Sequence, residues 1–327
     1  MTTFRIENHI IGESRIVRQL RERVAKLALS RVPVLIQGPT GAGKESVAES
    51  LHHLSGRPGI IAPVNVCAIA ESMFEDAFFG HVKGAFSGAE RDTVGFFGEA
   101  HRGTLFLDEI GGLARSAQPK LLRAVELGRY RPIGGRADSC SDFRLIAAAN
   151  EDLGALTEAG QFRFDLLQRF GASVIRVPPL DERPEDIPLL IGAFVSRASH
   201  QAAAVPRFSV DALQWLQERH WPGNVRELKS VVESVLAEIH DNVIGADDIE
   251  SVVPRADRAA PSVGSVIVGR SELLALLGER NWHIQSVAES LGVHRVTIWR
   301  WMQRFRIARP KIAARRGGVV EERSATP

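Results

Sequence analysis

Short apolar runs alternate with longer amphipathic stretches along about the first 250 residues of the chain. The runs have the length and β-branched content of single strands, and the stretches between them have the length of helices. Candidate strands occupy residues 32–37, 60–66, 104–107, 143–149 and 173–177. Strands that alternate with helices in this way form a parallel sheet with crossover helices. The pattern therefore predicts an α/β subdomain over residues 1–177.

The pattern changes at Pro178 and Pro179, after which helical periodicity dominates. Helices are predicted at residues 184–198, 209–218 and 224–240. Asn224, with Glu227 three residues later, resembles a capping box that would start the third helix. Residues 178–253 are therefore predicted to form a smaller, helical subdomain.

Residues 254–268 are rich in Pro, Ala, Ser and Gly, show no periodicity and are predicted to be a linker. Beyond them, helices are predicted at residues 271–280, 284–291 and 294–305, which gives the outline of a helix-turn-helix. This small all-α domain is expected over residues 269–310, followed by a basic, disordered tail at 311–327. Its predicted core consists of Val287, Ala288, Leu291, Val293, Ile298 and Met302.

The charge distribution points to a function for the last domain. The whole chain has a net charge of +2, but the 13 basic and 6 acidic residues from Arg255 onward give that part +7 and leave −5 for the rest. Residues 291–316 contain 8 basic residues and no acidic one. Such a stretch is typical of a surface that contacts nucleic-acid phosphates, although a solvated basic surface has the same composition. The side chains predicted to contact DNA are Arg295, Thr297, Arg300 and Arg304.

Composition excludes several other classes of protein. With 24% charged and 44% hydrophobic residues among 327, the chain is typical of a soluble globular protein of two or three domains. No apolar run approaches the roughly 20 residues of a membrane span, and the N-terminus has no signal-peptide pattern. Cys67 and Cys140 lack metal-ligand spacing, which favours a reducing, cytoplasmic location and a structural interpretation of both.

A phosphate-binding loop follows the first predicted strand and opens a helix. Its residues are Gly38, Pro39, Thr40, Gly41, Ala42, Gly43 and Lys44. The backbone N–H groups of such a loop bind phosphate oxygens, and the lysine places a positive charge at the β- and γ-phosphates. The loop therefore predicts nucleotide binding. Glu45 stands where the general pattern has a Ser or Thr that contacts Mg²⁺.

Two carboxylates, Asp108 and Glu109, follow the strand predicted at residues 104–107. In a nucleotide-hydrolysing site, Asp108 would hold Mg²⁺ and Glu109 would orient and polarise the attacking water. Asn65 and Asn150 end two further strands, where each amide would position Glu109, contact the γ-phosphate, or only cap a turn. Because ligands bind at the carboxyl ends of parallel strands, these residues are expected at one site.

Three arginines, Arg163, Arg169 and Arg226, are candidates to neutralise charge in the transition state. Arginine supplied to a phosphoryl-transfer site commonly stabilises the charge that develops there. The alternative is that these arginines are ordinary surface residues of helices.

A hexapeptide of small residues lies between the phosphate-binding loop and the acidic pair. It reads Gly84, Ala85, Phe86, Ser87, Gly88 and Ala89. The small residues allow the backbone to turn sharply and leave the single large apolar side chain able to reach a partner. The alternative is a tight turn with the phenylalanine in the core. The position of the hexapeptide within a nucleotide-hydrolysing domain favours a partner contact.

Together these motifs resemble the AAA+ domain of the sigma-54-dependent transcription activators, the bacterial enhancer-binding proteins. The resemblance covers residues 10–253, and the C-terminal helices resemble the Fis-type DNA-binding domain of that family. Glu45 is typical of the family. The sequences that carry the resemblance are GPTGAGKE at 38–45, FFGHVKGAFSGA at 78–89, GTLFLDEI at 103–110, PKLLRAVE at 119–126, VPPLDERPEDI at 177–187 and WPGNVRELK at 221–229.

The resemblance implies an ATP-hydrolysing homo-oligomeric ring, expected to be hexameric, in which Arg163 and Arg169 reach the ATP of a neighbouring subunit. It implies that Asn65 holds Glu109 and that Arg226 is a second sensor of the nucleotide. The hexapeptide would contact sigma-54 RNA polymerase holoenzyme and drive open-complex formation, while the helix-turn-helix binds double-stranded DNA upstream. About 30 residues precede the phosphate-binding loop, so no N-terminal control domain is expected and control would come from a trans-acting regulator or from abundance.

Several positions depart from the pattern of that family. Ser87 replaces the usual Thr and lacks one methyl group, which is worth about 0.8 kcal/mol when fully buried, or roughly a fourfold change in affinity. Ala149 replaces the Thr that usually precedes Asn150, which affects the expected contact with the γ-phosphate. The remaining departures are Val82 for Glu, Asp181 for Arg and Trp301 for Lys.

The sequence is compatible with two alternative functions. The first is a DNA-binding regulator on the same AAA+ scaffold that is not coupled to sigma-54. The second is an AAA+ remodelling chaperone or loader, against which the basic helix-turn-helix argues.

Overall fold

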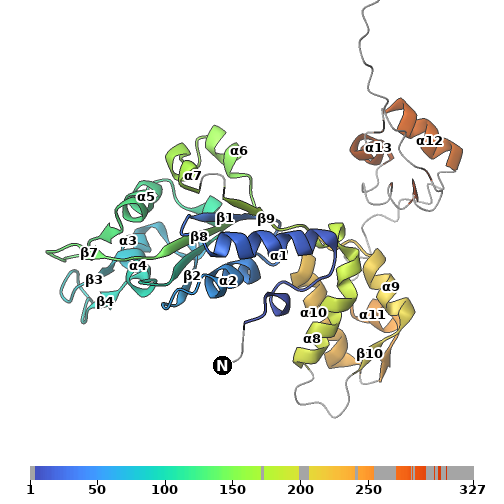
Figure 1. The fold of residues 1–327 in the computed structure, drawn as a ribbon, viewed down its shortest axis with the longest axis horizontal. Helices are drawn as coiled ribbons and strands as arrows, with labels where there is room; N and C mark the ends of the chain where they lie inside the picture. The colour runs from blue at the N-terminus through green and yellow to red at the C-terminus, as the bar shows by residue number, and fades with distance from the viewer. Residues whose placement is uncertain are drawn as a thin grey trace, which may run out of the picture. The chain divides into compact units, whose positions relative to one another are not determined.

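The computed structural model describes residues 4–170, 173–198, 206–239, 242–253, 270–280, 282, 284–291, 298, 301–302 and 307. The chain divides into two compact units, Met1–Val253 and Pro254–Pro327, which are considered separately below. Within the first unit, Figure 1 shows a sheet flanked by helices and a distinct helical bundle that follows it in the chain.

A five-stranded parallel sheet forms the centre of the first unit. Its strands are β1 (Val34–Gln37), β2 (Ile61–Asn65), β5 (Thr104–Asp108), β8 (Arg144–Ala149) and β9 (Val174–Arg176), in the order β2-β5-β8-β1-β9. Each lies within two residues of a predicted strand, so the predicted α/β architecture is confirmed. The register pairs Asn65 with Asp108 and Gln37 with Ala149, which brings the carboxyl ends of four strands to one edge.

Helices cover both faces of the sheet, because successive strand residues point to opposite sides. On one face, Val34, Ile36 and Ile146 pack with the apolar residues of α1 (Arg15–Ala28) and α2 (Lys44–Leu54). On the other face, Leu35 and Leu107 belong to a second buried cluster. Its helices are α3 (Phe74–Phe79), α4 (Phe96–Glu99), α5 (Gln118–Leu127), α6 (Leu153–Glu158) and α7 (Phe164–Phe170).

Two short antiparallel hairpins extend from this second face. They are β3 (Gly80–His81) with β4 (Thr93–Val94), and β6 (Arg129–Tyr130) with β7 (Ser139–Cys140). The backbone N–H of Val82 donates to the carbonyl of Ile133 at 3.1 Å, and the N–H of Ile133 donates to that of Gly80 at 2.8 Å. The loops that the hairpins carry are therefore joined at their bases.

The helical subdomain, called the lid below, follows β9. It contains α8 (Ile187–Ala198), α9 (Val210–Glu218), α10 (Asn224–Glu238) and α11 (Ala246–Val252), with β10 (Arg207–Phe208) pairing β11 (Val243–Ile244). These helices enclose their own apolar cluster, in which Trp221 is fully buried. Three of the helices match the helical stretches predicted after Pro179.

The predicted capping box at the start of α10 is wrong. Gly223 occupies the N-cap position, and Asn224 is the first helical residue, with a φ of 55°. Glu227 Oε2 accepts a hydrogen bond from the N–H of Gly223 at 2.8 Å, whereas the N–H of Asn224 donates to the carbonyl of Trp221 at 2.9 Å. The Asn224 side chain is used elsewhere, because it lies between the lid and the phosphate-binding loop.

The second unit contains α12 (Arg270–Glu279) and α13 (Ile284–Leu291). Of the predicted core, Val287, Ile298 and Met302 are buried in one cluster and Leu291 packs against it, while Ala288 and Val293 lie outside the described side chains. Trp301 also packs against this cluster, so the residue that replaces the usual Lys has an apolar role. No helix among the described residues is both long and apolar enough to cross a membrane.

Candidate functional site

The phosphate-binding loop connects the end of β1 to the first residue of α2. Lys44, at that first position, donates from Nζ to the carbonyl oxygens of Gly38 at 2.9 Å and Pro39 at 3.2 Å. Burial lowers the pKa of Lys44, while the charges of Asp108 and Glu109 oppose that shift. The amine therefore lies over the loop and close to the acidic pair, where it can exchange backbone carbonyls for phosphate oxygens.

The acidic pair ends β5 and leads into a strained turn. Asp108 Oδ1 accepts a hydrogen bond from the N–H of Glu109 at 3.0 Å. Glu109 has a φ of 56°, a left-handed conformation that is rare for a residue with a side chain and is often found at functional sites. Asn65 Nδ2 lies 3.4 Å from Glu109 Oε2, so the amide at the end of β2 holds the carboxylate at the end of β5.

The Asn65 side chain is itself fixed by the residue that follows it in the turn. Asn65 Oδ1 accepts a hydrogen bond from the N–H of Cys67 at 2.9 Å, which leaves its amide nitrogen directed at Glu109. The Cys67 thiol lies 3.8 Å from the carbonyl oxygen of Glu109. Cys67 and Cys140 are both free and exposed. The contact in this turn is consistent with a structural role for Cys67, and no such contact supports a structural role for Cys140 among the described residues.

Asn150 extends from the end of β8 toward the phosphate-binding loop. Its Nδ2 lies 3.4 Å from Thr40 Oγ1. Ala149, which precedes it, is fully buried, so the missing threonine hydroxyl leaves an apolar position and no unpaired polar group. The amide therefore reaches the loop directly from the strand end.

The lid contacts the phosphate-binding loop through three of its residues. Asn224 accepts a hydrogen bond from the N–H of Leu180 at 2.8 Å and donates from Nδ2 to the carbonyl oxygen of Thr40 at 3.0 Å. The N–H of Arg226 donates to the carbonyl of Gly41 at 3.3 Å. The buried guanidinium of Arg183 donates to the carbonyl of Ala42 at 2.9 Å.

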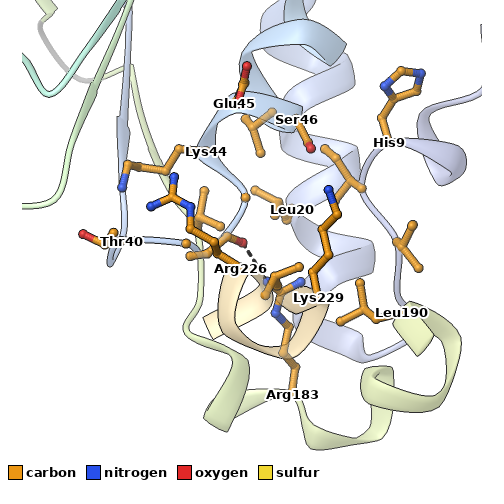
Figure 2. Close-up of a pocket in the computed structure, with 18 of the residues that line it drawn as sticks. His9, Leu20, Thr40, Lys44, Glu45, Ser46, Arg183, Leu190, Arg226 and Lys229 are labelled. Atoms are coloured by element: carbon orange, nitrogen blue, oxygen red, sulfur yellow. Dashed lines mark hydrogen bonds between the residues drawn. The ribbon is translucent and has the colours of Figure 1, made fainter. Parts of the chain in front are cut away.

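A cavity of about 340 Å³ opens between the loop, the acidic pair and the lid. Figure 2 shows Arg226 extending from the lid toward Lys44, whereas Lys229 extends toward Ser46 on the other side of the cavity. Residues predicted from sequence that line the cavity are Thr40, Gly41, Ala42, Gly43, Lys44, Glu45, Asp108, Glu109 and Arg226. Gly38, Pro39, Asn65 and Asn150 contact residues of this site without lining the cavity.

The other residues that line the cavity were not predicted from sequence. Most are apolar or basic, and they come from the N-terminal segment, α1, α2, the end of the sheet and the lid. They are His9, Ile10, Ile11, Leu20, Ser46, Val47, Val177, Arg183, Leu190, Phe194, Arg197, Val225 and Lys229. In the sequence the apolar members have the pattern of ordinary core positions. The only local signal is the Ile10–Ile11 pair immediately before Gly12.

The two remaining arginines do not belong to this cavity. Arg163 donates from Nη2 to Asp165 Oδ2 at 2.7 Å and from Nε to Asp165 Oδ1 at 3.0 Å, and this hydrogen bonding lowers the pKa of Asp165. Arg169 is exposed on α7. Neither lines the cavity of its own subunit.

The hexapeptide forms a closed loop at the tip of the β3–β4 hairpin. The N–H of Gly84 donates to the carbonyl of Ala89 at 2.8 Å, and the N–H of Ala89 donates to that of Phe86 at 3.1 Å. Gly84 and Gly88 have φ values of 80° and 105°, a region that only glycine adopts freely. Phe86 is 46% exposed, so the alternative in which it fills the core is wrong.

The Phe86 ring is supported on one side by the base of the hairpin. It meets the ring of His81 edge-on at 4.9 Å between centroids, and His81 Nδ1 lies 2.5 Å from Asp76 Oδ1 in α3. Ser87 is exposed and makes no hydrogen bond within the described part of the chain. The loop thus presents an aromatic ring and a free hydroxyl on a fixed backbone. The residues predicted to contact DNA, Arg295, Thr297, Arg300 and Arg304, lie outside the described residues.

Two family models match the first unit and the residues that follow it. Residues 10–176 match the sigma-54 interaction domain, and residues 181–264 match the AAA+ ATPase lid domain. Among curated proteins, the response regulator protein PilR of Pseudomonas aeruginosa is 38% identical over 300 residues, which cover 88% of this chain and 67% of PilR. The DNA-binding transcriptional regulator NtrC of Rhizobium meliloti is 38% identical over 269 residues, covering 80% of this chain and 56% of NtrC.

Solved structures give the same fold. The crystal structure of NtrX from Brucella abortus in complex with ATP has a TM-score of 0.66 and 31% sequence identity, covering 90% of this chain and 68% of that one. The same protein in complex with ADP has a TM-score of 0.68. The chain spans between about half and two thirds of the length of the curated relatives described above. The parallel sheet and helical lid are therefore those of an AAA+ domain.

Proposed function

The chain belongs to the family of the sigma-54 interaction domain with its AAA+ lid, and on that basis we propose that it is an ATP-hydrolysing transcription activator that remodels the sigma-54 RNA polymerase closed complex. The observation that carries the proposal is the exposed Phe86 on a rigid loop of a domain that also holds a phosphate-binding loop and an acidic pair. One folded unit thus contains both the residues expected to hydrolyse a nucleotide and an exposed side chain that can contact a partner.

ATP occupies the 340 Å³ cavity in this proposal, with its phosphates at the loop and its base among Ile10, Ile11 and Phe194. Lys44 and the backbone N–H groups at the start of α2 bind the β- and γ-phosphates. Mg²⁺ fits the phosphate end, because Asp108 supplies one carboxylate and this cation usually takes its other ligands from phosphates and water. When bound, the cation neutralises charge on the phosphate oxygens.

Glu109 is the residue that orients and polarises the attacking water. Its carboxylate is held by Asn65 at 3.4 Å, so release of that contact would free both oxygens for the water. In this proposal Asn150, which contacts Thr40 of the loop, responds to the γ-phosphate, and Arg226 responds to the nucleotide from the lid. Hydrolysis would therefore change contacts at the ends of β2 and β8 and on α10 at the same time.

The active form is proposed to be a homo-oligomeric ring, most simply a hexamer. The reason is that Arg163 and Arg169 lie outside the cavity of their own subunit, although phosphoryl transfer requires charge neutralisation that an arginine from a neighbour can supply. In such a ring the Gly84–Ala89 loops would converge on sigma-54.

Double-stranded DNA upstream of the promoter is the second proposed partner and would be bound by the C-terminal unit. We expect its binding to be steeply salt-dependent, because each phosphate contact adds roughly 0.9 to the slope of log affinity against log salt concentration. Fluorescence anisotropy with a duplex from an upstream site, over a salt titration, measures this slope. A flat response would remove Arg295, Arg300 and Arg304 from the phosphate contacts.

The Lys44→Ala variant is expected to lose ATP affinity by on the order of 100-fold or more, because Lys44 makes charge-assisted contacts with two phosphates. Isothermal titration calorimetry with ATP and Mg²⁺ measures the effect, and Lys26→Ala, an exposed lysine in the last turn of α1, is the matched control. Because Lys44 also bonds two loop carbonyls, thermal unfolding of both variants should be compared. Wild-type affinity in Lys44→Ala would place the nucleotide elsewhere.

The experiment that tests the proposal as a whole is transcription in a purified system. The protein, ATP and sigma-54 holoenzyme are combined on a supercoiled template with a −24/−12 promoter and an upstream site. Open complexes that require ATP hydrolysis support the proposal. Regulation only at promoters without −24/−12 elements would instead favour the DNA-binding regulator uncoupled from sigma-54, and failure to bind any duplex would favour a remodelling chaperone.

A further inference from the structure

Asp186 is a fully buried carboxylate at the start of the lid that the proposed mechanism does not use. Its Oδ1 accepts hydrogen bonds from the backbone N–H of Glu13 at 2.6 Å and of Ser14 at 2.8 Å. Its Oδ2 accepts a third hydrogen bond from the Ser14 hydroxyl at 2.6 Å. One lid residue thus binds a turn that precedes it by more than 170 positions in the chain.

The conformation of the turn depends on a glycine that leaves room for the carboxylate. Gly12 has a φ of 144°, and a Cβ atom at that position would lie 2.6 Å from Asp186 Cγ and from Oδ2. Real Cβ atoms do not approach other heavy atoms so closely, so only glycine lets the carboxylate reach the N–H groups behind it. A side chain at position 12 would therefore displace the carboxylate.

The bound turn directly follows one wall of the nucleotide cavity. Residues 9–11 line the cavity, and Gly12, Glu13 and Ser14 come next in the chain. A second lid residue holds the other end of this wall, since Arg197 Nη2 donates to the carbonyl oxygen of Asn8 at 3.2 Å. The wall also contacts the α/β subdomain, because Ile10 is buried in the apolar cluster of α1 and α2 and His9 Nδ1 lies 3.5 Å from Glu49 Oε2.

We propose that Asp186 is a positioning residue for the nucleotide, because it ties the wall formed by residues 9–11 to the lid. The inference rests on the proposed binding of ATP in this cavity. The phosphate end is held by the loop and Lys44, so the wall belongs to the end that faces the base. The carboxylate thus fixes the position of the base-facing wall relative to the lid.

This arrangement makes ATP affinity depend on a residue that does not touch ATP. Without the carboxylate, only a fraction of molecules would hold the wall in place, and the apparent dissociation constant rises as that fraction falls. Bound ATP would restore the wall by its own contacts, so the chemical step would be unaffected. A change of this kind raises KM and leaves kcat in place.

The test measures ATP turnover and ATP binding by calorimetry in the full chain. Asp186→Ala and Gly12→Ala are expected to raise KM and the dissociation constant for ATP by roughly 10- to 100-fold, the range for hydrogen bonds to a charged group. Their kcat at saturating ATP should stay within about twofold of wild type. Asp186→Asn keeps the shape and one acceptor oxygen, so its KM should lie between those of wild type and Asp186→Ala.

Asp248→Asn is the matched control, because Asp248 is also a lid carboxylate that accepts a backbone hydrogen bond, from Gly245 at 2.7 Å, and it does not line the cavity. It should lose thermal stability without a change in KM. If Asp186→Asn and Gly12→Ala lose stability in the same way and keep wild-type ATP affinity, Asp186 is only structural. A fall in kcat at unchanged KM would equally overturn the inference.

The Lys44→Ala variant separates this inference from the proposed function. If wild type binds ATP and Lys44→Ala does not, the cavity assignment stands, and the Asp186 variants alone decide the inference. If wild type does not bind ATP, the proposed function fails first. The double variant Ser14→Ala/Asp186→Ala should lose less ATP-binding free energy than the sum of the losses in the two single variants, because both changes remove the same contact.

Discussion

The Arg163→Ala variant is expected to lower ATP turnover by on the order of 10³ to 10⁵, the range for arginines supplied to phosphoryl-transfer sites. ATP binding should remain close to wild type, because Arg163 does not line the cavity of its own subunit. Arg163 instead pairs with Asp165 at 2.7 Å on the surface, where neither side chain is buried. Exchange of this exposed partner for a phosphate of a neighbouring subunit needs no rearrangement of the core.

Steady-state ATPase assays and ATP calorimetry measure the two halves of this prediction. Arg207→Ala, an exposed arginine on β10 of the lid, is the matched control and should keep wild-type turnover. A mixing experiment tests the action across subunits. An inactive Arg163→Ala protein and an inactive Lys44→Ala protein should regain part of the activity when combined, because some interfaces then contain an intact Lys44 and an intact Arg163. Wild-type turnover in Arg163→Ala would remove this residue from the site.

The Phe86→Ala variant is expected to abolish open-complex formation at a −24/−12 promoter while ATP turnover stays within about twofold of wild type. Truncation of an aromatic hot-spot residue costs roughly 2 kcal/mol or more, which is about 30-fold in affinity for a partner. The loop itself should keep its shape, because its closure depends on backbone hydrogen bonds between Gly84, Phe86 and Ala89. A loss of open-complex formation would therefore be caused by the absence of the Phe86 ring.

Permanganate footprinting of the promoter measures open complexes, and an ATPase assay on the same preparations gives the reference. Met73→Ala is the matched control, since Met73 is an apolar residue that is 53% exposed and lies outside the loop. Ser87→Thr should raise the yield of open complexes by up to about fourfold, which corresponds to the burial of one methyl group. If Phe86→Ala still opens promoters, the loop is not the contact with sigma-54.

The sequence located the chemistry better than it located the binding pocket. Lys44, Asp108 and Asn65 were predicted because each follows a strand whose apolar run is visible in the sequence, and parallel strands bring their ends together. Asn224 was misinterpreted, because its spacing to Glu227 fits a capping box as well as it fits a bridge to the loop. Local patterns do not reveal which of several hydrogen-bond partners a side chain will meet in the folded chain.

By itself the sequence determined the five strands, the phosphate-binding loop, the acidic pair and the hexapeptide, since each depends on neighbours within a few positions. The tertiary structure alone decided that Phe86 is exposed, that Arg163 lies outside the cavity of its own subunit and that residues 9–11 and the lid contribute to the cavity lining. The bond between Asp186 and Ser14 belongs to this second group. The two residues are far apart in the sequence, and only the packing of the lid against the N-terminal turn brings donor and acceptor together. A pattern of neighbouring residues therefore cannot predict this contact.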